Sequence, residues 1–561
     1  MTGALAPSWP GVDVPAATDD LLASLIREPW GQVSPSVYET ARLVSLAPWL
    51  TGHPGRVEFL LQTQQPGGGW GGPDGYALVP TLSATEALLT TVRRMAVGTG
   101  CEPDAGAQRL DYPTLADAAD RGLRRVFGWL GRRTSVPVPD MPAVEIIATA
   151  LIGSLNEHLE QLRDAPPAGL DAWQGAGRLY PPSGMDDGML TMIRSRLQAG
   201  AAVSEKLLHC VEVAGDAARG ARGVQPVPPG TVGASPAATA AWLGDRRPAG
   251  PDRRTEAGGT PGAQAPAIRH LEAVARRSGG PVPCGIPVTV FERAWVLSGL
   301  AGAGIELAAP GELVASLDAA LGENGTPGGA GLPPDADTTA VTLFALAQLG
   351  ARRDPACLWG FATPTHFCTW PGETNPSTSV NAHVLEAFGD WVANGPNAQS
   401  RYADAVTSLT RWLNDQQRPD GDWTDRWHAS PYYATACSAL ALSRYGAGET
   451  VPGESVRRAV EWVLGTQRPD GSWGRWGGTV EETAYAMQIL LRTRAGADGA
   501  RIRAAARGYG YLLRSIENPD RTPLWHDKDL YWPAAIVRSA VLAAMHLAQR
   551  NPAVVALTTR A

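Results

Sequence analysis

The stretch PPDADTTAVTLFALAQLG, residues 333–350, places two carboxyl groups and two hydroxyl groups where a helix is expected to begin. Asp335, Asp337 and Thr338 precede an apolar run that Gly350 ends. Aspartate and threonine are ordinary helix caps, so capping alone could explain them. A carboxyl group buried beside another can also stay protonated at neutral pH, and the helix dipole stabilises the anion that it leaves. The motif therefore predicts either a capped helix or an acid that can protonate a poor base.

Lysine is nearly absent from this chain. Lys206 and Lys528 are its only two lysines, and every other one of its 48 basic residues is arginine. A GC-rich coding bias is the simplest reason for so much arginine. The two lysines either remain by chance or mark positions that need a compact ammonium, which a planar guanidinium cannot replace.

The bulk composition bounds the classes of protein to consider. The chain has 561 residues, is 44% apolar and 18% charged, and carries a net charge of −7. A chain of this length is too long to fold around a single hydrophobic core, which predicts several domains. The absence of a basic stripe argues against nucleic acid as a partner. Six scattered cysteines without a C-x-x-C motif predict neither a disulfide framework nor a structural zinc site.

No stretch of the sequence looks like a targeting or membrane-spanning segment. The N-terminal stretch lacks the basic and apolar regions of a signal peptide. No run of roughly 18 apolar residues predicts a transmembrane helix. We therefore expect a cytoplasmic protein without a membrane span.

The apolar pattern is helical nearly throughout. Segments such as AVTLFALAQLGA and AYAMQILLRTRAG recur with Gly, Pro or Asp between them, which predicts an all-α protein built of helical hairpins. Residues 244–266 are rich in Gly, Pro and Arg and lack periodicity, so they predict a mobile loop. A domain boundary is expected near residues 270–283.

A short motif occurs three times. Residues 59–70 read FLLQTQQPGGGW, residues 412–423 read WLNDQQRPDGDW, and residues 462–473 read WVLGTQRPDGSW. Each predicts a helix end, a glycine turn and a tryptophan that packs on the neighbouring hairpin. These repeats are interpreted as structural.

Taken together, these motifs resemble those of class II terpene cyclases, in particular bacterial enzymes similar to copalyl diphosphate synthases. DADTTA resembles their Asp-x-Asp-Asp signature, residues 34–50 resemble their Tyr-Asp-Thr-Ala stretch, and residues 286–305 resemble their Phe-Glu-x-x-Trp helix. The resemblance spans about residues 30–545. It implies two α-barrel (α/α toroid) domains in the βγ arrangement.

The same resemblance implies how the chain is divided between the barrels. Residues 281–561 would form the β-like barrel that carries the acid, joined by an N-terminal segment of residues 1–25. Residues 26–280 would form the inserted γ-like barrel. The active site would lie between the two.

The resemblance also assigns roles around the acid. Asp337 would protonate a carbon–carbon double bond, with Asp335 beside it. Thr338 stands where the family has another aspartate, which changes the local charge and the resupply of protons. SVNAHVLEAF, residues 379–388, resembles the helix that supplies the acid's partner, so His383 would orient Asp337, with Asn381 as the second candidate. These two are two positions apart on a helix, so only one is expected to touch the acid.

The other end of the substrate needs cations. Lys206 in EKLLHCVEV and Lys528 in DKDLYWP resemble diphosphate-binding stretches of related enzymes, and an ammonium suits a diphosphate as a point charge. Asp140 and Glu145 in PDMPAVEII resemble a proposed Mg²⁺ site, and Mg²⁺ commonly bridges one or two carboxylates to substrate phosphates. The alternative is an exposed loop aspartate and a glutamate at a helix start.

Carbocations need walls that do not react with them. The aromatic faces of Trp476, Trp427, Tyr432 and Tyr433 could line the site, because aromatic rings stabilise cations and exclude water. Packing in the core is an equal alternative for each of them.

The reaction implied by the resemblance is the cyclisation of geranylgeranyl diphosphate to a bicyclic labdane-type, copalyl-like diphosphate. The runner-up is farnesyl diphosphate giving drimenyl diphosphate. A hopene-type triterpene cyclase, a zinc prenyltransferase β-subunit and a non-catalytic helical-repeat binding protein are less favoured. MDDGML, residues 185–190, lacks the third aspartate of an ionising motif, so a separate class I terpene synthase is the expected user of the product.

Overall fold

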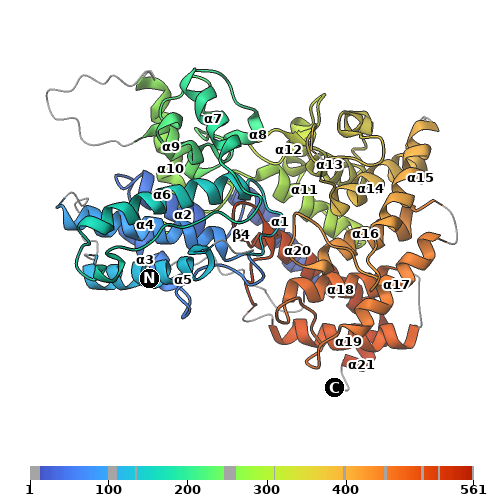
Figure 1. Ribbon diagram of the computed structural model, residues 1–561. Helices are drawn as coiled ribbons and strands as arrows, with labels where there is room; N and C mark the ends of the chain where they lie inside the picture. Colours follow the sequence, from blue (N-terminus) through green and yellow to red (C-terminus); the bar gives the residue numbers. More distant parts are fainter. Residues whose placement is uncertain are drawn as a thin grey trace.

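The computed structural model describes residues 13–98, 110–132, 136–244, 261–308, 310–373, 375–395, 400–447, 451–493, 498–515 and 519–558. Within these residues, helices are joined by loops and by two short hairpins, which confirms the all-α prediction. The helices form two bodies, one blue to green and one yellow-green to red in Figure 1. Each body is a closed ring of helices.

The C-terminal body is an α/α barrel. Six inner helices close a ring, since each contacts the next and the last contacts the first. They are α11 (Thr289–Gly302), α13 (Ala336–Gln348), α14 (Thr378–Asn394), α16 (Pro431–Tyr445), α18 (Val480–Arg492) and α20 (Ala534–Gln549). The outer helices are α12 (Gly311–Ala320), α15 (Ser400–Asp415), α17 (Val451–Gly465), α19 (Asp498–Ser515) and α21 (Pro552–Thr558).

Burial patterns explain which helices are inner. In α13 every residue from Thr338 to Leu346 is buried, as expected for a helix with neighbours on all sides. In α15 the buried residues include Tyr402, Val406 and Leu409, which form one stripe at helical spacing. The outer ring therefore presents its polar faces to solvent.

The N-terminal body is a second, smaller ring. It is formed by α2 (Val37–Leu46), α4 (Leu78–Ala96), α6 (Val144–Asp164), the 3₁₀ segment η2 (Val211–Ala218) and α9 (Pro236–Leu243), which returns to α2. Around it lie α3 (His53–Thr63), α5 (Tyr112–Leu130), α7 (Gly188–Gln198), α8 (Glu205–Leu208) and α10 (Pro261–Arg277). The expected loop at 244–266 is too long at its C-terminal end, because α10 already begins at Pro261. Its residues 245–260 lie outside the described residues.

The N-terminal helix belongs with the C-terminal barrel. Helix α1 (Val14–Arg27) packs on α20, and Leu21 and Leu25 lie in the apolar cluster of that barrel. The chain returns to the C-terminal barrel slightly later than the expected 280/281 boundary, because Val282 and Ile286 are still buried in the core of the N-terminal barrel.

The three repeats make the same contacts, which confirms that they are structural. Their tryptophans, Trp70, Trp423 and Trp473, each donate the indole N–H to a backbone carbonyl ten residues earlier, at 2.7–2.8 Å. Their glutamines each donate to two carbonyls, one in the turn and one on a neighbouring helix. Each repeat thus fastens one hairpin to the next.

Two hairpins matter for the site. Strand β1 (Thr326–Pro327) pairs antiparallel with β2 (Pro334–Asp335), with Thr326 opposite Asp335. Strand β3 (Trp525–His526) pairs with β4 (Leu530–Tyr531), which lies between the two bodies in Figure 1. In the described part of the chain, no helix has both the length and the apolar character needed to cross a lipid bilayer.

Candidate active site

Asp335 is a helix cap. It ends β2, and its carboxylate accepts the Thr338 N–H at 2.6 Å in the first turn of α13. Burial raises the pKa of Asp335 to about 7, against the hydrogen bonds from Thr338, which lower it. The Asp335 carboxylate therefore satisfies the backbone N–H of Thr338 and fixes the start of the helix that carries Asp337.

Asp337 and His383 form the acid centre. They lie on the adjacent inner helices α13 and α14, and His383 Nδ1 donates to Asp337 Oδ1 at 2.6 Å. Burial alone would lower the pKa of His383, but the Asp337 carboxylate holds this pKa well above its usual value. Asp337 Oδ2 has no hydrogen-bond partner among the described residues, and the side chain is 13% exposed. One oxygen is thus held by His383 and the other has no partner among the described residues.

Asn381 has a different role. Its amide donates to the carbonyls of Phe367 and Ser377 and accepts the Phe367 N–H at 2.8 Å. It holds the loop before α14 and does not contact the acid. Of the two candidates, the structure places only His383 on Asp337.

An aromatic wall continues from the acid centre. The Trp295 ring meets His383 edge to face, with centroids 5.6 Å apart, and its indole N–H donates to the Tyr433 hydroxyl at 3.0 Å. Phe291 packs on Trp295 at 4.4 Å, and Trp525 packs on Tyr433 at 4.8 Å. These rings come from α11, α16 and β3, so the ring of inner helices together with the hairpin builds the wall.

Of the two candidate tyrosines, Tyr432 packs in the core, the alternative that the sequence left open, and Tyr433 lies in the aromatic wall. Tyr432 packs on Trp462 of the outer helix α17, with centroids 4.6 Å apart, and is buried in the barrel core. Consecutive residues on a helix point in directions about 100° apart, so Tyr433 faces inward where Tyr432 faces outward. Phe291 and Trp295 belong to the Phe-Glu-x-x-Trp motif, but their place in the wall was not predicted from the sequence.

A chain of alternating charges bridges the two barrels. Lys206 of the N-terminal barrel pairs with Glu373 of the C-terminal barrel. The guanidinium of Arg426 lies 3.5 Å from the carboxylate of Glu373 and 3.2 Å from that of Asp140, a residue of the N-terminal barrel. We call these four residues the rim. The Lys206 side chain is 47% exposed, so solvent reaches this rim.

Two tryptophans support the cations of the rim. The Lys206 ammonium lies 4.7 Å from the centre of the Trp370 ring, and the Arg426 guanidinium lies 5.3 Å from Trp427. The two rings meet edge to face at 5.4 Å. Trp427 is therefore part of a cation platform at the rim, not of the aromatic wall beside the acid.

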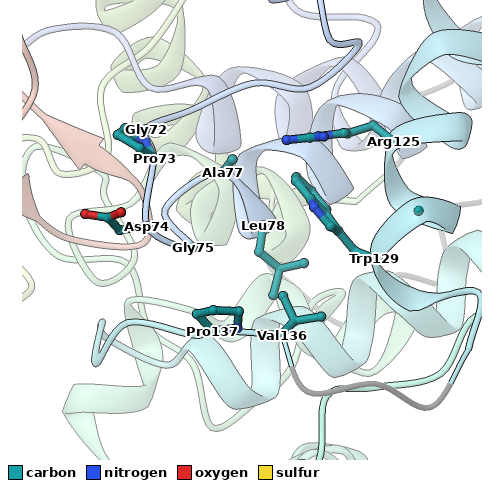
Figure 2. Close-up of a pocket in the computed structure, with 11 residues that line it drawn as sticks. Gly72, Pro73, Asp74, Gly75, Ala77, Leu78, Arg125, Trp129, Val136 and Pro137 are labelled. Atoms are coloured by element: carbon teal, nitrogen blue, oxygen red, sulfur yellow. The ribbon is translucent and has the colours of Figure 1, made fainter. Parts of the chain in front are cut away.

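A third cation lies along the same junction. Arg475 pairs with Asp74 at 2.9 Å, and Trp476 donates its indole N–H to the same carboxylate at 2.8 Å. Asp74 also borders a cavity of about 300 Å³ in the N-terminal barrel. Figure 2 shows its carboxylate pointing away from Arg125 and Trp129, which line the cavity on the other side. This cavity contains no residue of the acid centre.

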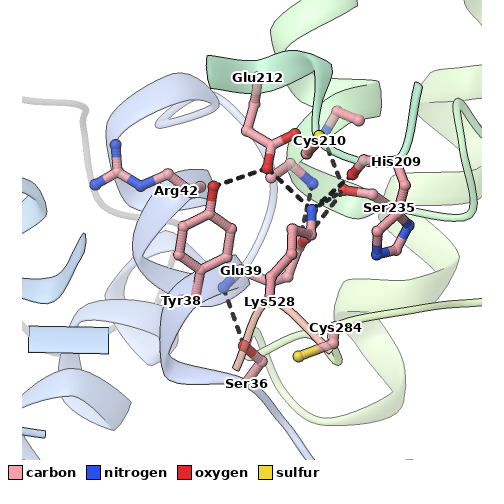
Figure 3. A network of polar contacts seen from close by, with 12 residues as sticks. Ser36, Tyr38, Glu39, Arg42, His209, Cys210, Glu212, Ser235, Cys284 and Lys528 are labelled. Carbon is pink, nitrogen blue, oxygen red and sulfur yellow. Dashed lines mark hydrogen bonds and ion pairs between the residues drawn. The ribbon is translucent and has the colours of Figure 1, made fainter. Parts of the chain in front are cut away.

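Lys528 does not lie at the rim, which corrects its expected role. It sits in the β3–β4 turn, fully buried, and donates to His209 O at 2.8 Å, Glu212 Oε1 at 2.9 Å and Ser235 Oγ at 2.9 Å (Figure 3). It also pairs with Glu39. Burial would lower the pKa of Lys528, but Glu212 and Glu39 hold it above its usual value. Every donor is used by protein acceptors, so none is left for a diphosphate. We call this cluster the joint.

The two expected metal ligands are accessible. Asp140 is about half exposed beside Arg426, and Glu145 is exposed in the first turn of α6. Among the described residues, no group of three or more His, Cys, Asp or Glu side chains could hold a metal ion. Hard carboxylate oxygens fit Mg²⁺, provided that substrate phosphates and water supply the other ligands.

Comparisons with known proteins agree with this geometry. The family model for the squalene-hopene cyclase C-terminal domain matches residues 373–528. The chain is 41% identical to an ent-copalyl diphosphate synthase of Streptomyces sp. (strain KO-3988), over 95% of this chain and 96% of the relative. It is 41% identical to a labda-7,13-dienyl diphosphate synthase of Streptomyces clavuligerus, over 98% of this chain and 96% of the relative.

A solved structure extends the similarity to the whole fold. The ent-copalyl diphosphate synthase from Streptomyces platensis superposes with a TM-score of 0.85 at 44% identity, covering 95% of this chain and 99% of that chain. Identity at this level over nearly the full length of both chains covers both barrels and the acid centre. The chain belongs to the copalyl diphosphate synthase family of class II terpene cyclases.

Proposed function

We propose that this enzyme cyclises geranylgeranyl diphosphate to a bicyclic labdane-type diphosphate and leaves the diphosphate on the product. The observation that carries the proposal is the Asp337–His383 pair, an acid with one free oxygen beside an aromatic wall. The names of the relatives, which are copalyl and labdadienyl diphosphate synthases, favour the C20 substrate.

The acid centre has the parts that the first step needs. A proton on Asp337 Oδ2 passes to the terminal alkene, whose π electrons form the new C–H bond. His383 then stabilises the carboxylate through its hydrogen bond to Oδ1. The faces of Trp295, Phe291 and Trp525 stabilise the cation as the rings close and keep water away from it.

The rim is the proposed site for the diphosphate. Lys206 and Arg426 are cations whose present partners, Glu373 and Asp140, are carboxylates. A diphosphate offers the same kind of oxygen in greater number and charge. Substrate would therefore replace the carboxylates, with Arg475 as a third cation released from Asp74.

We further propose that Mg²⁺ assists at this end. Asp140 and Glu145 would hold the ion together with phosphate oxygens, and when bound it would neutralise part of the diphosphate charge. The expected test is calorimetric titration of substrate with and without Mg²⁺. Glu145→Gln should weaken the Mg²⁺-dependent part of substrate binding and leave the Mg²⁺-independent part unchanged. Asp140→Asn should also weaken the Mg²⁺-dependent part, although it frees Arg426 from a competing carboxylate.

A product assay tests the reaction itself. Purified enzyme is given geranylgeranyl or farnesyl diphosphate with Mg²⁺, and dephosphorylated products are identified by gas chromatography–mass spectrometry. A bicyclic C20 alcohol that is lost in Asp337→Asn supports the proposal, and a bicyclic C15 alcohol instead would favour the drimenyl reaction. Consumption of neither substrate by folded protein would overturn both. Because no ionising motif accompanies the acid, a separate class I terpene synthase is the proposed user of the product.

A further inference from the structure

Glu481 is a buried carboxylate without a counter-charge. It lies in the first turn of α18 and is 2% exposed. Three donors converge on one of its oxygens, Oε1: Trp525 Nε1 at 2.7 Å, His428 Nε2 at 3.1 Å and Tyr485 Oη at 3.3 Å. The other oxygen, Oε2, is buried and has no hydrogen-bond partner. Leaving a buried carboxylate oxygen unsatisfied is costly.

The nearest candidate for a counter-charge is neutral. His428 Nδ1 accepts the backbone N–H of Ser430 at 3.0 Å, so this nitrogen carries no proton. The single ring proton is therefore on Nε2, which donates to Glu481. Among the described residues, no lysine or arginine forms an ion pair with Glu481. The polar contacts orient the carboxylate but do not neutralise it.

Glu481 lies at the far end of the aromatic wall from the acid. Trp525, its closest donor, packs on Phe291 with ring centroids 5.7 Å apart. Phe291 packs on Trp295, and Trp295 contacts His383, the partner of Asp337. Tyr531 lies within electrostatic reach of both ends: burial raises its pKa well above the usual value, and nearby carboxylates that include Glu481 and Asp337 add to the increase. One wall thus has the acid centre at one end and, at the other, a buried carboxyl group that no lysine or arginine of the described residues neutralises.

This placement fits the last step of the reaction in Proposed function, on which the inference rests. After cyclisation the bicyclic cation must lose a proton. The C–H bond beside the cationic carbon breaks, its electron pair forms the new alkene, and the proton needs an acceptor. Asp337 has just become an anion, but it is held by His383 at the start of the path. We infer that Glu481 stabilises the bicyclic cation and that its Oε2 accepts the terminating proton. Solvent restores both carboxyl groups between turnovers.

Glu481→Gln tests this inference, because glutamine keeps an oxygen for Trp525 and His428 but is not a base. We expect the melting temperature to stay within about 3 °C of the parent. The rate of formation of the parent product should fall about 100-fold, and hydroxylated or isomeric bicycles should make up a larger share of the products. Asp520→Asn is the matched control. Asp520 caps the same helix through the Val480 N–H at 2.9 Å, so its loss should leave the product ratio unchanged.

The outcomes separate the two proposals. If Glu481→Gln makes the parent product within twofold of the parent rate while Asp337→Asn is inactive, Glu481 is only a structural anchor for Trp525 and the inference is overturned. If the parent enzyme makes no bicycle from either diphosphate, the proposed function itself fails. Should Glu481→Gln not fold, Glu481→Asp withdraws the carboxylate by one methylene, and an unchanged product ratio in that variant also overturns the inference.

Discussion

The two lysines of this chain both bridge the barrels, but in opposite ways. Lys528 reaches from the C-terminal barrel into the N-terminal one and is completely buried between Glu39 and Glu212. Lys206 reaches from the N-terminal barrel to Glu373 and is half exposed. The same ammonium group therefore forms a permanent joint in one place and an exchangeable contact in the other.

Burial decides between these two behaviours. Breaking a buried pair leaves charges that no solvent can reach, so the contact persists. An exposed pair contributes little, because water and salt compete with it. A highly charged ligand can therefore displace Glu373 from Lys206, whereas nothing displaces Glu212 from Lys528. The lysine is kept at the joint because its ammonium directs donors to acceptors on several sides, including His209 O, Ser235 Oγ and Glu212.

The largest effect is expected from Lys528→Met. This change leaves Glu39 and Glu212 buried without a cation, so we expect the unfolding free energy to fall by about 3–5 kcal/mol, measured by urea denaturation followed by circular dichroism. Lys206→Met, the control at the rim, should change it by less than about 1 kcal/mol. Equal stabilities of the two variants would remove the distinction between joint and rim.

The next prediction tests the rim through its effect on substrate binding. Arg426→Gln removes a rim cation that pairs with Asp140 and Glu373, so we expect KM for the prenyl diphosphate to rise about 10-fold, equivalent to roughly 1.4 kcal/mol, with kcat changed much less. Steady-state kinetics measures both constants. Arg457→Gln, which removes exposed pairs with Glu454 and Glu461 on the outer helix α17, should leave KM unchanged. A fall in kcat alone would place Arg426 outside the diphosphate site.

The pH dependence of stability sharpens the description of the joint. Two carboxylates share one ammonium there, and burial raises the pKa of Glu39 from 4.5 to about 7. A carboxyl group with a raised pKa in the folded state contributes stability that is fully present below pH 4.5 and is lost as the pH rises through about 7. Glu39→Gln should therefore flatten the decline of the unfolding free energy over this window by about 1–2 kcal/mol. An unchanged slope would mean that Glu39 is ionised throughout.

The smallest effect is that of salt. Raising the ionic strength from about 0.05 to 0.5 M should weaken substrate binding at the rim severalfold, because exposed charges are screened. The stability difference between the parent and Lys528→Met should stay constant over the same range, since the joint is out of reach of ions. Loss of this difference at high salt would contradict the burial of the joint.

The acid centre could be predicted from sequence in part. The carboxyl motif and its similarity to a known signature pointed to Asp337, and helical spacing correctly predicted that only one of Asn381 and His383 touches it. Spacing did not say which, because that depends on the angle at which α14 packs on α13. For the same reason the sequence did not separate Tyr432 from Tyr433, which pack on different neighbours of one helix.

The rim was predicted only in part and Glu481 was missed, for another reason. Arg426 and Arg475 look like ordinary surface arginines in the sequence, because arginine makes up all but two of the 48 basic residues. Glu481 follows a threonine cap in TVEETAY and resembles a first-turn acid of any helix. Only its burial and the hydrogen bonds of His428 distinguish it from such a residue.

What the sequence alone determined is local. Helices, their caps and the tryptophan bonds of the three repeats follow from contacts within about a dozen residues, and the three copies form the same tryptophan bond wherever they occur. What only the tertiary structure decided is the pairing of charges. Lys528 and its acceptor His209 O are 319 positions apart, and whether such a contact is buried depends on how two complete barrels close around it. Desolvation belongs to that assembled interface, not to any residue in it.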